Sequence, residues 1–302
     1  FELHQEREKL LQQPRPVKGG KDISAVLRFY MASEKYASLK PRTRKDYDGH
    51  LTYFADKLGE LHPRNIERHH VIKWQAAWAK NATPHSANYR KRILRIVMEA
   101  AKDMGILTKQ DENPCKGVSD IKYEKQEREP WPIECIQAFR EAYNYGTRER
   151  TCFELCHGTG QRIGDVLKMQ WGDVKDGSIA LRQGKTSKRL LVPLTPHLRA
   201  ALDATKRESL YILSKDMTKT DKPGPWAYRS AAQAMLKARR AVGAENYDLH
   251  SLRYSAASEL VTAGASDELV SAVTGQSMAM VAHYTKQVRQ IVRAKEAQKL
   301  RE

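Results

Sequence analysis

Apolar residues recur at helical spacing through the first third of the chain. The first such stretch follows Asp22, which is placed to cap its first turn. Further amphipathic helices are predicted to begin at Pro41 and to cover residues 71–78 and 89–104. Residues 22–117 are therefore predicted to form a small helical bundle.

Polar segments containing proline and glycine flank this bundle. Residues 1–21 are charged and polar, and we interpret them as an N-terminal linker segment. Residues 118–131 lack apolar periodicity and are the predicted interdomain linker. Residues 132–302 then form the second domain, in which residues 286–302 are expected to be a charged tail helix. A frayed end is the alternative for that tail.

The second domain is predicted to be mostly helical with one interruption. Ile179 and Leu181 alternate with other residues, as do Leu190 and Val192, so two short strands flank the sequence GKTSK. This pattern indicates a β-hairpin with Lys185 at its turn. The fold class that follows is mainly α with a small β-hairpin or sheet, in two domains, one helical and one mixed α/β.

The charge of the chain indicates what it binds. The formal net charge is +17 and the sequence pI is about 9.7, which favours a polyanionic partner, with nucleic acid first. An anionic membrane is the rival, but no apolar run has bilayer length and the mean hydropathy is −0.68. We therefore expect a DNA-binding protein of the cytoplasm, associated with the nucleoid, and no membrane partner.

Cysteine usage fits a reducing compartment. The spacing does not suggest a disulfide framework in a chain of this size. Cys152, Cys156 and His157 could be misread as half a metal site, but no second Cys/His pair follows nearby. No metal is predicted, and we expect small core residues at all of the cysteines, Cys115, Cys135, Cys152 and Cys156.

Two basic clusters in the helical bundle are candidates for DNA contact, because both are predicted near helix beginnings. A solvated basic face is the alternative for any single side chain. The clusters are Lys40, Arg42, Arg44 and Lys45, and Arg90, Lys91 and Arg92.

Two arginines of the second domain each have a polar neighbour three positions away. Asp165 has this spacing from Arg162, and a carboxylate one turn away can hold a guanidinium in the orientation that anion binding requires. A surface ion pair is the alternative. His250 and Arg253 lie near a predicted helix start, where free N–H groups favour a phosphate. The pattern H-x-x-R arises readily by chance, so its position gives it weight.

Tyr284 would complete a phosphate site, although a half-buried core aromatic is the alternative. Displacement at a phosphodiester needs stabilisation of the nonbridging oxygens, a proton for the leaving oxygen and a nucleophile. Arginines, a lysine and a tyrosine supply these functions, and a covalent ester conserves the bond energy. No carboxylate cluster that would hold two magnesium ions stands out, so we predict no metal or nucleotide cofactor.

The order and spacing of these residues resemble the tyrosine recombinase family, which contains phage integrases and chromosome-dimer resolvases. The stretches TGQRIGDVLKMQWGDV, GKTSKRLLVPL, HSLRYSAASEL and TGQSMAMVAHYTK look like the family's arginine, lysine-hairpin, H-x-x-R and tyrosine boxes. The match covers about residues 22–286, because the bundle ending in NPCKGV also resembles the family's core-DNA-binding domain.

The resemblance implies a role for each candidate residue. Arg162 and Arg253 would hold the scissile phosphate, Lys185 would protonate the 5′ oxygen, and His250 would assist proton transfer. Tyr284 would attack and leave a 3′-phosphotyrosine and a free 5′ hydroxyl, and a second strand's hydroxyl would reverse the step.

Two further positions complete the set. The resemblance implies that Asp165 supports the site indirectly, without binding the phosphate itself. Gln276 departs from the family, which usually has His or Trp directly after the glycine of the tyrosine box, and the gap from there to Tyr284 is one residue shorter than expected. Glutamine can still donate a hydrogen bond to a phosphate oxygen, so a reduced or differently tuned rate is expected.

The resemblance also implies partners. These are double-stranded DNA with core or attachment sites, a homotetramer on DNA in which the tail packs on a neighbour, and accessory DNA-bending and excisionase proteins of a mobile element. The chain opens on Phe1, so we expect a removed upstream region that could hold an arm-site domain. The alternatives are a type IB topoisomerase, which relaxes supercoils by similar chemistry, and a catalytically silent DNA-binding protein of the same fold.

Overall fold

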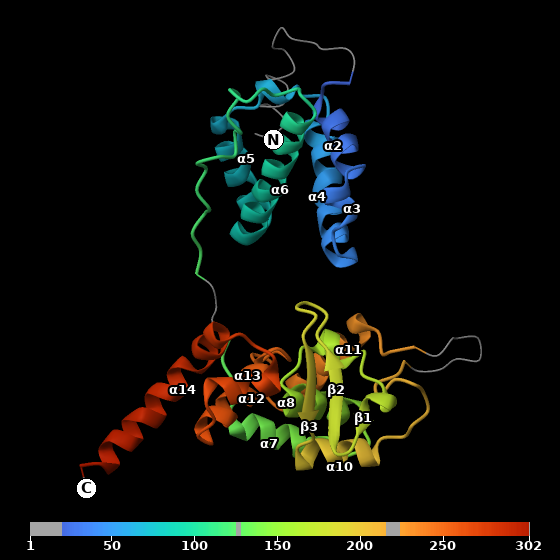
Figure 1. Cartoon of the computed structure of the whole chain (residues 1–302), viewed down its shortest axis with the longest axis vertical. Coiled ribbons are helices and arrows are strands. Elements are labelled where there is room, and N and C mark those ends of the chain that lie inside the picture. Colours follow the sequence, from blue (N-terminus) through green and yellow to red (C-terminus); the bar gives the residue numbers. More distant parts are fainter. Residues whose placement is uncertain (1–19, 125–127, 216–223, 302) are drawn as a thin grey trace. The chain divides into compact units, whose positions relative to one another are not determined.

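The computed structural model describes residues 20–124, 128–215 and 224–301, so nearly all of the predicted N-terminal linker lies outside the described residues. The chain divides into two compact units, residues 1–125 and 126–302 (Figure 1). Each unit has its own hydrophobic core.

The first unit is a helical bundle, as predicted. Asp22 caps the first helix, and its carboxylate accepts the N–H of Ala25 at 2.8 Å. Phe54, Trp74 and Val97 are buried between the helices and form the middle of the core. The short helix α3 was not predicted. The elements are α2 (Ile23–Met31), α3 (Glu34–Ala37), α4 (Pro41–Leu58), η1 (Pro63–Asn65), α5 (Arg68–Asn81) and α6 (Pro84–Asp103).

The predicted linker, residues 118–131, is held at both ends. The side-chain amide of Asn88 donates to the carbonyl of Ile121 at 2.9 Å, which fastens the beginning of the segment to the first unit. The backbone N–H of Trp131 donates to the hydroxyl of Ser255 at 2.8 Å, which fastens its end to the second unit. Each end of the predicted linker is therefore bonded to the unit next to it.

The second unit surrounds α8, most of whose residues are buried. Helices α10 and α12 pack against it, and a small antiparallel sheet lies beside them. The elements are α7 (Ile133–Ala142), α8 (Arg148–Thr159), α9 (Ile163–Val166), η2 (Trp171–Asp173), β1 (Val174–Lys175), β2 (Ser178–Arg182), β3 (Arg189–Pro193), α10 (Pro196–Ala204), α11 (Tyr228–Ala241), α12 (Ser251–Thr262), α13 (Asp267–Thr274) and α14 (Met278–Lys299).

The predicted hairpin is confirmed. Strands β2 and β3 pair antiparallel, with Ile179 opposite Val192 and Arg182 opposite Arg189, and Lys185 lies in the turn between them. The short strand β1 was not predicted. It pairs with β2, so the sheet has the order β1-β2-β3 within the described residues.

The predicted tail is the continuation of a longer helix. Ser277 caps α14, which runs without a break from Met278 to Lys299 and carries Tyr284 in its second turn. Its end, red in Figure 1, extends beyond the other helices of the unit. Within the described ranges, no helix has both the length and the apolar character needed to cross a bilayer. All of the cysteines are free thiols, and Cys135 alone among them is only partly buried.

Candidate active site

Arg253 is held under the end of α8 by the backbone. The C-cap of α8 is Gly160, which has a φ of +60°, a conformation that favours glycine. Its carbonyl accepts from Nη1 of Arg253 at 2.5 Å. The side chain of Arg253 comes from the first turn of α12 and is only 1% exposed. Arg162 is the N-cap residue of α9, two positions after Gly160, so both arginines converge on one bend of the chain.

Several nitrogens of these two arginines have no acceptor. Nε and Nη2 of Arg253 and Nη1 of Arg162 are buried and lack a hydrogen-bond partner among the described residues. Burial lowers the pKa of Arg253 to about 10, and the positive charge of Arg162 acts in the same direction. The guanidinium therefore remains charged at neutral pH. A buried, unneutralised cation with orphaned donors is suited to an anion from outside the chain.

His250 is neutral at physiological pH. Burial lowers its pKa to about 4, and neighbouring positive charges, first that of Arg128, act in the same direction. The carboxylate of Asp248 accepts from Nε of Arg128 at 3.0 Å and from the backbone N–H of Ser251 at 2.8 Å. It thereby fixes the start of α12, where His250 is the N-cap residue. A neutral imidazole has a nitrogen that can accept a proton.

One cavity of about 590 Å³ unites several of the predicted residues. Its lining includes Arg162, Asp165, Lys185 and His250, together with basic side chains that sequence reasoning did not select. Among these, Arg128 lies within the predicted linker, where no sequence pattern marked it. Arg253 and Tyr284 are not part of this lining. They belong to the same electrostatic cluster, because both Arg162 and Tyr284 influence the pKa of Arg253.

Tyr284 reaches the cluster through ring contacts. Its ring stacks on that of Tyr254 with centroids 3.8 Å apart and an interplanar angle of 23°. Tyr254 in turn meets His250 edge to face at 5.9 Å. Burial, and then a hydrogen bond with Tyr284, raise the pKa of Tyr254 well above its ordinary value. Sequence reasoning missed Tyr254, although its position directly after Arg253 and four after His250 placed it on the same helical turn.

Asp165 contacts the hairpin rather than Arg162. Its Oδ1 accepts the backbone N–H of Gly184 at 2.8 Å, directly before Lys185. No hydrogen bond or ion pair joins Asp165 to Arg162 in the part of the chain that the structure describes. The expected guanidinium support is therefore corrected to support of the turn.

Gln276 occupies a buried position after α13. It follows Gly275, which ends the helix with a φ of +69°. The side chain is 5% exposed, and neither its Nε2 nor its Oε1 has a hydrogen-bond partner among the described residues. An orphaned amide at such a place is expected in a site that awaits a polar ligand.

The basic clusters of the first unit differ from each other. Lys40, Arg42 and Lys45 are exposed at the start of α4. The second cluster lies in the second and third turns of α6 and not at its beginning, which corrects the prediction. Lys91 is buried there, and its ammonium binds Asp120 and the carbonyl of Val118.

The remaining cluster members have partners within the first unit. Arg44 packs over the ring of Tyr36 at 5.4 Å. Arg90 packs over the ring of Tyr53 at 4.0 Å, and exposed Arg92 pairs with Asp120. We therefore remove only Lys91 from the candidate DNA contacts, because its ammonium is buried and already paired.

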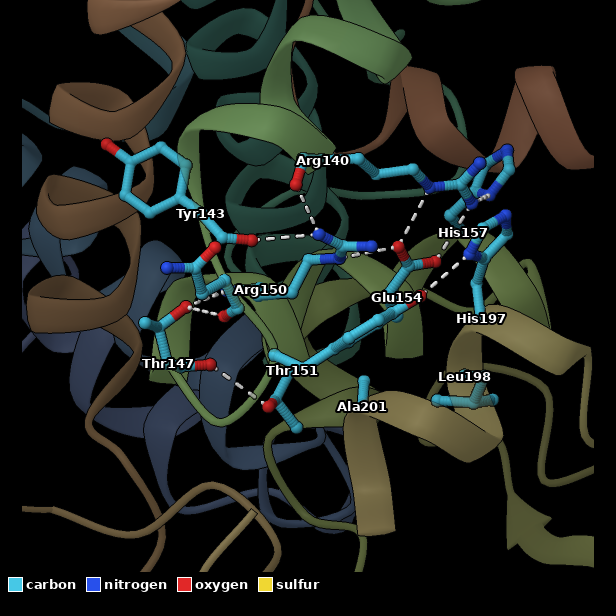
Figure 2. Close-up of polar contacts among 12 residues, drawn as sticks. Arg140, Tyr143, Thr147, Arg150, Thr151, Glu154, His157, His197, Leu198 and Ala201 are labelled. Carbon is cyan, nitrogen blue, oxygen red and sulfur yellow. Dashed lines mark hydrogen bonds and ion pairs between the residues drawn. The ribbon is translucent and has the colours of Figure 1, made fainter. Parts of the chain in front are cut away.

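A second, largely buried ionic cluster is centred on Glu154 in the middle of α8 (Figure 2). Figure 2 shows the guanidinium groups of Arg140 and Arg150 directed at the carboxylate of Glu154, with shortest distances of 2.9 and 2.8 Å. Glu154 is 0% exposed. No group of three or more potential metal ligands from His, Cys, Asp and Glu occurs among the described residues.

The fold and the site together define a mostly helical domain in which two arginines, with buried nitrogens that lack a partner among the described residues, lie near a tyrosine. Residues 133–290, just over half of the chain, match the phage integrase family. The chain belongs to this family, which confirms the resemblance found in its sequence.

Individual relatives agree with this assignment. The integrase of Escherichia phage HK022 is 25% identical over 192 residues, which make up 63% of this chain and 52% of that protein. The tyrosine recombinase XerD of Corynebacterium glutamicum is 29% identical over 136 residues, 43% of this chain and 45% of that protein. The chain thus spans about half the length of these relatives.

Solved structures share the fold. A lambda integrase dimer bound to a COC′ core site has a TM-score of 0.75 at 19% identity, covering 93% of this chain and 84% of that chain. The Tn1549 transposon integrase in complex with a circular intermediate DNA has a TM-score of 0.71 at 11% identity, covering 87% and 95%. These matches confirm the predicted fold class.

Proposed function

We propose that the chain is a site-specific DNA recombinase that cleaves and rejoins DNA through a 3′-phosphotyrosine at Tyr284. The observation that carries the proposal is the set of buried, unpartnered nitrogens on Arg162 and Arg253 beside that tyrosine. The names of the relatives, integrase and tyrosine recombinase, support the same activity.

In the proposed reaction, the phenol oxygen of Tyr284 attacks phosphorus, forms a new P–O bond and displaces the 5′ oxygen. Arg162 and Arg253 stabilise the charge on the nonbridging oxygens. Neutral His250 accepts the phenol proton, and Lys185 gives a proton to the leaving oxygen. The reverse attack by a 5′ hydroxyl of a second strand regenerates the tyrosine. The steps balance without an external energy source, because the ester keeps the bond energy.

Gln276 and Asp165 complete the proposed site. The orphaned amide of Gln276 would donate to a phosphate oxygen, which is the role that His or Trp has in the resemblance. Asp165 holds the backbone of Gly184 and would keep the Lys185 turn near the phosphate.

Double-stranded DNA with core or attachment sites is the proposed substrate. The net charge of +17 and the exposed cluster at the start of α4 support it, and Arg44, Arg90 and Arg92 remain candidate contacts. Solved relatives include a lambda integrase tetramer bound to a Holliday junction, and we propose a tetramer on DNA for this chain. The exposed Ile291 of α14 and Leu300, directly after the helix, would pack on a neighbouring protomer.

The cellular setting belongs to the same proposal. The protein would act in the cytoplasm, on the nucleoid, for the integration and excision of a mobile element. Because one active site can run both directions, an excisionase and a DNA-bending protein outside the site would choose between them.

The test traps the covalent intermediate. A duplex that the full chain selects from a randomised pool is nicked beside the cleavage position, so that the released fragment diffuses away. We expect a protein–DNA adduct with the wild type and none with Tyr284→Phe. An adduct that survives this substitution would contradict the nucleophile assignment. Relaxation of arbitrary supercoiled DNA without exchange between paired sites would favour a topoisomerase, and a synaptic complex of fewer than four protomers would contradict the tetramer.

A further inference from the structure

Two buried glutamines lie between the arginine pair and the hairpin turn. Gln161 directly precedes Arg162, and Gln183 follows β2, two positions before Lys185. Their exposed fractions are 0% and 1%. Burying an amide is unfavourable unless its hydrogen bonds are made, so the partners of these two side chains show which segments each one holds.

Gln183 joins the turn to the interior. Its amide nitrogen donates to Oε1 of Gln161 at 2.7 Å and to the carbonyl of Thr274, at the end of α13, at 2.9 Å. Its side-chain oxygen accepts from the hydroxyl of Thr186 at 2.6 Å, and its backbone N–H donates to the carbonyl of Lys188 at 2.9 Å. The residue therefore fixes the turn from the inner side of the hairpin.

Gln161 joins the same network to an arginine. Its amide nitrogen donates to the carbonyl of Thr159 at 2.9 Å and to those of Val273 and Thr274 at 3.3 Å each. Its side-chain oxygen accepts from Gln183 and also lies 3.5 Å from Nη1 of Arg253. One oxygen atom is thus shared by the phosphate-binding arginine and the glutamine of the hairpin.

The backbone at Gly275, directly before Gln276, packs closely against this pair. A Cβ at Gly275 would lie 2.5 Å from Nε2 of Gln183, so a side chain at this position has no room. Gly275 also has a φ of +69°, which favours glycine independently. The pair Gln161–Gln183 therefore touches, or directly adjoins, the segments that carry Arg162, Arg253, Gln276 and the Lys185 turn.

We infer that the Gln161–Gln183 pair positions the turn of Lys185 relative to Arg253, so that the proton donor and the phosphate-binding arginine are held in register. This inference rests on the proposed function and deepens it. Neither glutamine needs to touch DNA, so both are positioning residues. Hydrogen bonds are directional, which lets the pair set the location of the turn in a way that apolar packing would not.

The chemistry of the leaving group separates a positioning role from a merely structural one. An alkoxide leaving from phosphorus needs a proton, whereas a thiolate leaves readily because thiols are far more acidic than alcohols. Replacing the 5′ bridging oxygen by sulfur should therefore rescue a variant whose proton donor is misplaced. It should not rescue a variant that has lost phosphate binding or stability.

The experiment measures single-turnover adduct formation on the selected duplex with oxygen or sulfur at the bridging position. We compare the wild type with Gln183→Leu, Thr186→Val and Lys185→Met, the last as the reference for a missing donor. We expect Gln183→Leu to be slower by about 100-fold with oxygen and within about threefold of the wild type with sulfur. Thr186→Val removes one hydroxyl from an exposed turn, so it should fold and show a smaller loss with the same rescue.

Gln75→Leu is the matched control. Gln75 is also a buried glutamine, bonded to Asn88 at 2.7 Å, but it belongs to the first unit. Relative to the wild type, Gln75→Leu should therefore have the same rate of adduct formation on the oxygen substrate as on the sulfur substrate. The inference is overturned if Gln183→Leu and Thr186→Val cleave the oxygen substrate like the wild type, or if both are equally slow on the two substrates. Failure of the proposed function looks different, because the wild type would then form no adduct with either duplex.

Discussion

Two cationic clusters lie beside α8 and differ in one respect. In the first, Arg140 of α7 and Arg150 of α8 share the carboxylate of Glu154 in the middle of α8, and Arg150 also donates to backbone carbonyls, including that of Tyr143 at 2.8 Å. In the second, under the C-terminal end of α8, Arg253 has a carbonyl for one nitrogen and no counterion among the described residues. The first, which we call the closed cluster, contains its own carboxylate counterion, and the second, the open cluster, does not.

This difference separates structural from functional use of the same side chain. In the closed cluster, burial would raise the pKa of Glu154, but hydrogen bonding with Arg140 and the nearby positive charges outweigh it and hold the pKa below its ordinary value. In the open cluster, burial and like charge together lower the pKa of Arg253. A charge kept in an unfavourable place is typical of binding sites, where the ligand supplies the missing partner.

The largest expected effect comes from removing a charge of the open cluster. Arg253→Gln should slow adduct formation by about 1000-fold, or roughly 4 kcal/mol, because donors to the nonbridging oxygens are lost. The free energy of unfolding should stay within about 1 kcal/mol of the wild type or rise, because an unneutralised buried charge is removed. Single-turnover cleavage and denaturant unfolding measure the two effects. A large loss of stability would show that the guanidinium is structural, as we expect for Arg140→Gln.

Glu154→Gln should show the opposite behaviour. The substitution leaves buried Arg150 and partly buried Arg140 without a counterion, which should destabilise the second unit by about 3–5 kcal/mol. The thermal midpoint should then fall by on the order of 10 °C. Adduct formation per folded molecule should remain close to that of the wild type at a temperature where both are folded. A midpoint equal to that of the wild type would remove the distinction between the clusters.

The sequence predicted features that depend on neighbours along the chain. Asp22 caps the first helix where expected, because an N-cap bonds within its own first turn. Strands β2 and β3 alternate as predicted, since one face of the sheet is buried. The candidate residues of the second domain were found because their motifs occur in a fixed order, although each motif alone was weak.

The sequence did not predict contacts between distant segments. Spacing alone assigned Asp165 to Arg162, but folding brings the N–H of Gly184 to its carboxylate instead. Lys91 was assigned to DNA because its neighbours are basic, yet its side chain points inward and binds Val118. Helical periodicity around residue 91 could have raised the question, but the partner lies 27 positions away and leaves no local pattern.

The smallest expected effect is the dependence of the free energy of unfolding on pH. Each cluster should show this dependence in a different pH range. The pKa of His250 falls from 6.5 to about 4 on folding, so between these values the unfolded chain binds a proton that the folded chain does not. Stability should therefore decrease as the pH falls from 6.5 towards 4, by about 1–2 kcal/mol, since solvent screens this partly buried group. Glu154, whose pKa is lowered from 4.5, contributes stability that is lost only below pH 4.5. Burial also lowers the pKa values of His50 and His197, so the effect is taken as the difference in denaturant unfolding between the wild type and His250→Asn. A histidine whose pKa is ordinary in the folded state contributes nothing to the slope of the free energy of unfolding against pH. An identical slope in both proteins from pH 6.5 to 4.5 would therefore mean that the open cluster does not lower the pKa of His250.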